Sequence, residues 1–123
     1  MTPEQTARIV KVCERIGWPK SSTYFLVWDK SDCGWYWYGQ PSTRQMSCAE
    51  DDAEAILEKH FRQWLESKYD RVLIEYTSGL PFKWRIECGM DREMESRVRV
   101  AGNDYLDLLL TAVEQTLVQE AKP

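Results

Sequence analysis

The spacing of apolar residues changes after Asp70 from the period of a helix to the period of a strand. Before that point, apolar side chains recur every three or four residues, as on one face of an amphipathic helix. After it, Val72, Ile74 and Tyr76 alternate with their neighbours, as in a strand with one face on a core. The chain is therefore expected to belong to the α+β class. The helical stripe consists of Ile56, Leu57, His60, Phe61, Trp64 and Leu65.

Capping signals mark the beginnings of the first two helices. Thr2 and Gln5 have the spacing of a capping box, and Gly17 is placed to end that helix after about four turns. Ser47 and Glu50 repeat the capping box before the middle helix. The sequence thus predicts three helices. The third follows Gly102 and carries the apolar residues Tyr105, Leu106, Leu109, Val113 and Leu117.

Five segments have the length and composition of strands, and they are residues 24–28, 35–38, 72–76, 82–88 and 97–100. The first two form a hairpin that is apolar on both faces, whereas the other three alternate apolar and polar residues. Residues 40–46 form a polar link with room for a short edge strand. The predicted order is helix, strand, strand, helix, strand, strand, strand, helix, around one mainly antiparallel five-stranded sheet.

The number of layers depends on what covers the hairpin that is apolar on both faces. A chain of 123 residues has the size of one domain, so a single domain over residues 1–123 is expected. The one-sided strands need helices on one face only. The hairpin needs either a helix across its second face or a second subunit. The sequence therefore predicts a two- or three-layer sandwich.

Charge and hydropathy exclude several classes of protein. The net charge of −4 and the pI near 5.1 disfavour general binding to nucleic acids or acidic membranes. No apolar run approaches the length of a membrane span, and the N-terminal residues lack the apolar core of a signal peptide. We therefore expect a cytoplasmic protein. In that compartment Cys13, Cys33, Cys48 and Cys88 are reduced thiols.

Residues capable of catalysis or metal binding do not form a recognisable motif. His60 is the only histidine, and Cys33, Cys48 and Cys88 are its conceivable partners, but no CxxC pair exists. Its place on the apolar stripe favours a structural histidine. No glycine-rich phosphate loop is present. The sequence predicts no catalytic residue, no metal and no cofactor, with an enzyme that uses His60 as the remaining alternative.

The aromatic residues and four cations form a candidate binding surface. The chain has six tryptophans and six tyrosines, most of which must be core. The hairpin strand with Trp35, Tyr36, Trp37 and Tyr38 could offer rings for stacking. Cations on strands beside it could contact phosphates, although Glu75 and Glu87 share their face. A nucleotide or single-stranded nucleic acid is therefore an alternative ligand. The four cations are Lys83, Arg85, Arg97 and Arg99.

The last helix has more apolar width than one core contact needs. Leu108 and Leu110 lie outside its main stripe. Such surplus apolar surface is typical of an interface. We therefore expect these two leucines to contribute to a homodimer.

The second half of the chain has a Trp-containing amphipathic helix, a hairpin around Gly79 with Trp84 in its second strand, and a third strand at residues 97–100. A final helix containing Leu109 and Thr111 follows. This layout, over residues 52–117, resembles small phage and prophage proteins described as α/β/α (ABA) sandwiches. The resemblance implies a small accessory protein and no catalytic residues.

Size, acidity and element content are also similar to those of type III secretion chaperones, which are acidic dimers. Their layout has three strands before the middle helix, so this resemblance requires a strand at residues 44–48. The sequence as a whole predicts a non-enzymatic accessory or regulatory protein, of a kind that phages encode, acting through contacts with an unidentified protein partner and as a homodimer. The alternatives are a module for nucleotides or single-stranded nucleic acid and a chaperone-like acidic dimer.

Overall fold

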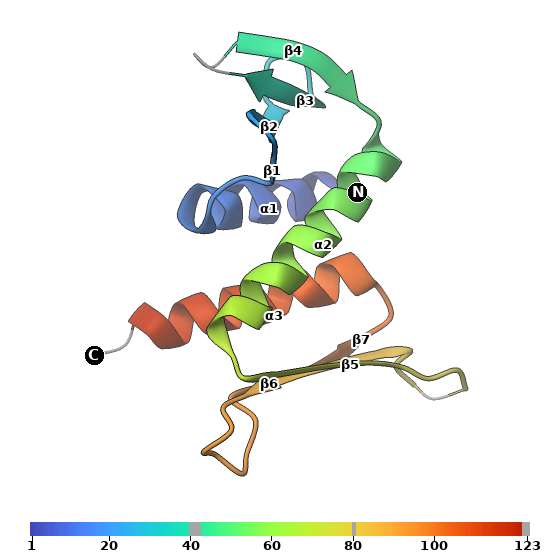
Figure 1. The fold of residues 1–123 in the computed structure, drawn as a ribbon. Coiled ribbons are helices and arrows are strands. Elements are labelled where there is room, and N and C mark those ends of the chain that lie inside the picture. The colour runs from blue at the N-terminus through green and yellow to red at the C-terminus, as the bar shows by residue number, and fades with distance from the viewer. Residues whose placement is uncertain (40–42, 80, 122–123) are drawn as a thin grey trace. The chain divides into compact units, whose positions relative to one another are not determined.

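Three helices and two antiparallel sheets alternate along the part of the chain that the computed structural model describes, residues 1–39, 43–79 and 81–121 (Figure 1). The helices are α1 (Pro3–Ile16), α2 (Glu50–Lys68) and α3 (Tyr105–Ala121). The chain forms two compact units, Met1–Leu57 and Glu58–Pro123. The α+β class predicted from the sequence is confirmed.

Helix α1 begins and ends at the residues that the sequence indicates. The Thr2 hydroxyl oxygen accepts a hydrogen bond from the backbone N–H of Gln5 at 3.1 Å, which satisfies one of the free donors of the first turn. At the other end Gly17 has φ of 100°, a conformation that side chains with a Cβ rarely adopt, and its N–H donates to Cys13 O. Ile9, Val12 and Cys13 form the buried face of this helix.

The sheet of the first unit is a meander of four strands. Its strands are β1 (Lys20–Ser21), β2 (Tyr24–Asp29), β3 (Gly34–Gly39) and β4 (Thr43–Cys48), in spatial order β1-β2-β3-β4. Three indole rings pack against one another beside this sheet. Trp35 is 3% exposed, with the Trp28 ring 5.3 Å and the Trp18 ring 6.5 Å away between centroids, both in edge arrangements.

The sheet of the second unit contains three strands. They are β5 (Arg71–Tyr76), β6 (Trp84–Gly89) and β7 (Val98–Gly102), in spatial order β5-β6-β7. Helix α3 packs over β6 and β7. One face of the sheet carries the apolar rows that point toward this helix, and Ile86, Cys88 and Val98 there are fully or almost fully buried. Strand β5 is therefore an edge strand whose apolar face is less covered than that of its neighbours.

The predicted single five-stranded sheet is wrong. The described residues form seven strands in two separate sheets, with four strands before α2 and three after it. Strand β1 escapes prediction because two residues carry no periodic signal. Strand β4 gives only a weak signal because its sequence is polar and its side chains are mostly exposed. Its presence supplies the strand at residues 44–48 that a chaperone-like layout requires, with β1 as an additional strand. The single-domain expectation stays a prediction.

A buried hydrogen bond joins the end of α2 to α3 within the second unit. The Tyr69 hydroxyl lies 2.7 Å from Thr116 Oγ1, and that oxygen also donates to Ala112 O at 2.9 Å. The Tyr69 O–H is thus the donor in the first bond, because the single Thr116 proton is already used.

The two partners of this bond should differ in the cost of their removal. Thr116→Val leaves the buried Tyr69 hydroxyl without a partner and should lower the free energy of unfolding by about 1–3 kcal/mol. Tyr69→Phe leaves Thr116 bonded to Ala112 and should cost only about 0.5–1.5 kcal/mol. Urea denaturation of both variants measures the difference, and a larger loss for Tyr69→Phe would contradict the assignment of the donor.

Candidate interaction surface

The aromatic residues of β3 do not form one surface. Successive side chains of a strand point to opposite faces. Trp35 lies on the covered face with Trp18 and Trp28, and Trp37 shares that face by alternation. Tyr36 and Tyr38 lie on the opposite face. The predicted platform of four rings is therefore divided, and its tryptophan half belongs to the core side of the sheet.

The tyrosine face of this sheet carries a network around two carboxylates. The Tyr38 hydroxyl donates to Asp29 Oδ2 at 3.0 Å, and the Arg44 guanidinium donates to the same oxygen at 3.0 Å. Arg44 also bonds Asp32 and lies over the Tyr36 ring at 4.4 Å. These contacts connect β4 to the turn between β2 and β3. Because each of these polar groups has a partner inside the network, we interpret it as a structural element of the turn.

Hydrogen bonding lowers the pKa of Asp29 from its usual 3.8 to about 2, chiefly through the Ser31 hydroxyl and then through Tyr38 and Arg44, while desolvation acts in the opposite sense. Because the pKa is lower in the folded protein, the ionised carboxylate stabilises the fold above about pH 4, and this contribution is lost as the pH falls toward about 2.

The variant Asp29→Asn should therefore be less stable than the wild type at neutral pH and should lose less stability between about pH 4 and about pH 2. Thermal unfolding at a series of pH values measures this difference. Identical pH profiles for the two proteins would show that Asp29 has no such role.

The predicted cations are mostly neutralised by neighbouring carboxylates. Arg85 Nη2 donates to both oxygens of Glu75 at 2.9 Å across β5 and β6. Arg99 Nε lies 3.2 Å from Glu87 on the same open face. Arg97 makes two hydrogen bonds, of 2.8 and 2.6 Å, to Glu93 in the loop before β7. Lys83 precedes β6 and lines a small hollow there. Since all three arginines are paired, the four cations do not form one free positive patch.

Two of the four thiols are buried and only weakly acidic. Burial raises the pKa of Cys13 to about 12 and that of Cys88 to about 11, so neither is a thiolate at neutral pH. The His60 ring lies 5.9 Å from that of Phe61 on α2. Within residues 1–39, 43–79 and 81–121, no group of three or more histidine, cysteine or acidic side chains could hold a metal ion.

The rate at which iodoacetamide alkylates each cysteine of the native protein should increase with the exposure of its thiol. Cys33 is exposed and should react first, with the half-buried Cys48 slower, while the buried Cys13 and Cys88 should react only after denaturation. Mass spectrometry of tryptic peptides at successive times measures the order. Modification of Cys88 in the native protein as fast as that of Cys33 would contradict the burial.

The side chains of Leu108 and Leu110 are buried in the folded chain. Their exposed fractions are 5% and 0%, and a Cβ added to Gly102 of β7 would meet a δ-carbon of Leu108 at 3.4 Å. The width of the apolar surface on α3 is thus explained by contacts within the chain. The prediction of a homodimer interface at these two leucines assumed that they were exposed, and the structure does not have them exposed.

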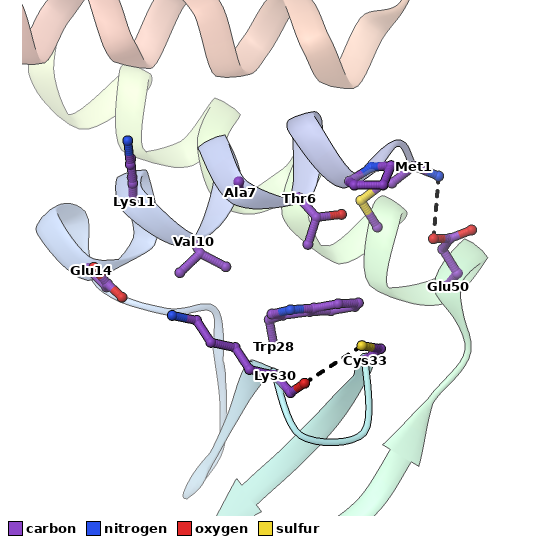
Figure 2. A pocket seen from close by; sticks show the side chains of 11 residues that line it. Met1, Thr6, Ala7, Val10, Lys11, Glu14, Trp28, Lys30, Cys33 and Glu50 are labelled. Atoms are coloured by element: carbon purple, nitrogen blue, oxygen red, sulfur yellow. Dashed lines mark hydrogen bonds and ion pairs between the residues drawn. The ribbon is translucent and has the colours of Figure 1, made fainter.

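A hollow of about 580 Å³ lies beside α1 in the first unit (Figure 2). Figure 2 shows Val10 directed toward the Trp28 ring, while Lys11 points away from it. At one end the amino group of Met1 pairs with Glu50 at 3.3 Å. The remaining lining combines small apolar groups with scattered charges, so no set of polar groups converges on a ligand position.

Three exposed apolar side chains belong to the hairpin of β5 and β6, with Leu73 on its open face and Tyr76 on the opposite face. Leu73 is 43% exposed, Tyr76 59% and Phe82 54%. The Tyr76 ring lies 4.9 Å from that of Trp84, which stacks on Tyr105 at 4.5 Å. A hollow of about 220 Å³ on the same hairpin is lined in part by Phe82, Trp84 and Arg85. We call Leu73, Tyr76, Phe82 and the free backbone edge of β5 the β5 edge surface.

Sequence reasoning missed the β5 edge surface although one signal for it was present. Val72, Leu73 and Ile74 are apolar at three successive positions, whereas a one-sided strand would have a polar residue at the middle one. Leu73 is therefore an apolar residue on the open face, where it lies beside Glu87. Which strand forms an edge depends on pairing, and the sequence does not contain that information locally.

Comparisons with protein-family models, with curated proteins and with solved structures find no match to this chain. The likeness to ABA sandwiches and to secretion chaperones thus stays an expectation from the sequence. Among the described residues no helix is both long and apolar enough to cross a membrane.

Proposed function

We propose that this chain is a non-enzymatic accessory protein that acts through contacts with other proteins, and that the β5 edge surface is where a partner binds. The observation that carries the proposal is the coincidence of a free strand edge with exposed Leu73, Tyr76 and Phe82. An extended segment of a partner would add to the sheet as a further strand, with backbone hydrogen bonds supplying affinity and side chains supplying specificity.

The other described strand edges are less suited to strand addition. Strand β1 has only two residues, and β4 is polar with an irregular register opposite Trp37 and Tyr38. Such irregularities protect edges from pairing. Strand β7 exposes only Arg99 and Ala101, so no large apolar side chain is exposed on it. Strand β5 pairs with β6 in unbroken register over six residues, so its outer edge is regular as well.

Charge pairing supports a protein partner over a nucleic acid. Arg85, Arg97 and Arg99 each contact a carboxylate within 3.2 Å, so binding of phosphates there would first have to break these pairs. A nucleotide or single-stranded nucleic acid is for this reason the second candidate, and its binding would fall as salt rises.

The proposal can be tested by selecting binders from a displayed random-peptide library on the immobilised protein. Selected peptides should bind wild-type protein, and Leu73→Lys should weaken their binding about tenfold or more by placing a charge in the apolar contact. The matched control is Val118→Lys, at an exposed apolar position of α3. Circular dichroism of both variants checks that they are folded.

Two outcomes would contradict the proposal. One is that selected peptides bind Leu73→Lys as well as they bind the wild type, which would place the contact elsewhere. The other is that no peptide is enriched while a single-stranded oligonucleotide binds in a salt-dependent manner, which would favour the second candidate.

A further inference from the structure

We infer that the β5 edge pairs with the β5 edge of a second copy of this chain, forming a continuous six-stranded antiparallel sheet across a twofold axis at Leu73. This inference rests on the proposed function and names the partner of the same surface. It follows from the direction of the backbone groups of β5, from the order of its side chains and from the contacts that its charged residues already make.

The backbone groups available at the free edge belong to alternate residues. The N–H of Thr77 donates to the carbonyl oxygen of Lys83, the residue just before β6, at 2.8 Å. The backbone groups of Thr77 therefore point toward the β6 side of the hairpin. In an antiparallel ladder this direction alternates from residue to residue. Leu73 and Glu75 therefore also bond to β6. Val72, Ile74 and Tyr76 direct their N–H and C=O groups outward, where no described strand of this unit meets them.

These directions limit the possible registers between two copies. Two residues can exchange hydrogen bonds across the interface only if the backbone groups of both point outward. Since these are alternate residues, the twofold axis must lie where one residue faces the same residue of the other copy, and not midway between two successive residues. An axis at Leu73 places Val72 opposite the partner's Ile74, and each such pair exchanges two hydrogen bonds. Leu73 then faces the partner's Leu73 at a position without hydrogen bonds, where opposing side chains come closest.

On the open face the same register joins opposite charges. Arg71 lies opposite the partner's Glu75, and Glu75 lies opposite the partner's Arg71. Glu75 already accepts from Arg85 in its own sheet, and Arg71 lies 3.5 Å from Asp91. The pairing would therefore create a row of side chains with alternating charge across the interface. Like charges never face one another in it.

On the helix-covered face the same register joins apolar groups. Val72 and Ile74 are half-buried in the chain, and each would gain an apolar neighbour from the other copy. The main contacts of α3 with this sheet are to β6 and β7. Tyr76, at the exposed end of its ring stack, would face the partner's Asp70, to which its hydroxyl could donate a hydrogen bond.

The neighbouring registers lack this complementarity. An axis at Val72 would set Leu73 against the partner's Arg71, and an axis at Ile74 would set Leu73 against the partner's Glu75. An axis at Arg71 or at Glu75 would oppose two identical charges. Only the axis at Leu73 matches apolar with apolar and positive with negative at every position from Arg71 to Glu75.

A charge-reversal experiment tests the register itself. Arg71→Glu should weaken self-association about tenfold, because the new carboxylate would face the partner's Glu75, and Glu75→Arg should do so to a similar degree. A mixture of the two variants should restore association, since each copy then meets only opposite charges. Sedimentation velocity over a wide range of protein concentration measures all three samples and the wild type.

The mixture also separates an interface from a fold defect. Arg71 donates to Met90 O and Glu93 O, and Glu75 binds Arg85, so either variant could disturb its own copy. Such a defect would persist in the mixture, whereas loss of a contact between copies would be reversed. Leu73→Arg should abolish association, while Val118→Arg, at an exposed apolar position of α3, should leave it unchanged.

Each result has a distinct meaning. Association of the wild type that is lost in the single variants and restored in the mixture supports the pairing. A wild type that stays monomeric at every concentration, or single variants that associate like the wild type, would overturn it. In that case, selected peptides that bind the wild type but not the Leu73→Lys variant would still support the proposed function, and the partner would be another protein.

Discussion

Among the described strands, β5 pairs with β6 on one side and with none on the other, and the proposed function depends on this asymmetry. The arginines on the open face of that sheet already have partners, because Arg85 binds Glu75 and Arg99 pairs with Glu87. Backbone groups at a strand edge can be satisfied by water, but a second strand satisfies them and covers Leu73 as well. Exposed apolar side chains beside such an edge therefore favour binding of another strand over binding of an anion.

In the first unit, the four successive aromatic side chains of β3 point alternately to the two faces of the sheet and have a different role on each. Trp35 and Trp37 lie on the covered face, where the indole of Trp35 packs against Trp18 and Trp28. Tyr36 and Tyr38 lie on the other face, where the Tyr36 ring contacts Arg44 and the Tyr38 hydroxyl bonds Asp29. The same four residues thus stabilise the sheet on one side and fix its turn on the other. This division accounts for the density of aromatic residues in a single strand without a ligand.

Local signals predicted the helices and the pairing of Glu75 and Glu87 with cations of the same sheet face, whereas the capping box expected at Ser47 and Glu50 is wrong because Ser47 belongs to β4. Longer-range features escaped prediction. Thr2 and Gly17 mark α1 because capping is chemistry between near neighbours, and the pairing of Arg85 with Glu75 follows from one hairpin. Strand β4 was uncertain because an exposed edge strand needs no apolar alternation. The division into two sheets, and hence the free edge beside Leu73, depends on which strands pair, and periodicity alone does not encode that choice.

Residue-resolved amide hydrogen exchange at several protein concentrations tests the central claim most directly. The account predicts that the amides of Leu73 and Glu75, bonded to β6, are protected at every concentration. The amides of Val72 and Ile74 should exchange quickly in dilute solution and become protected as the concentration rises. Fast exchange of Val72 and Ile74 that is independent of concentration would contradict pairing of the β5 edge with a second copy.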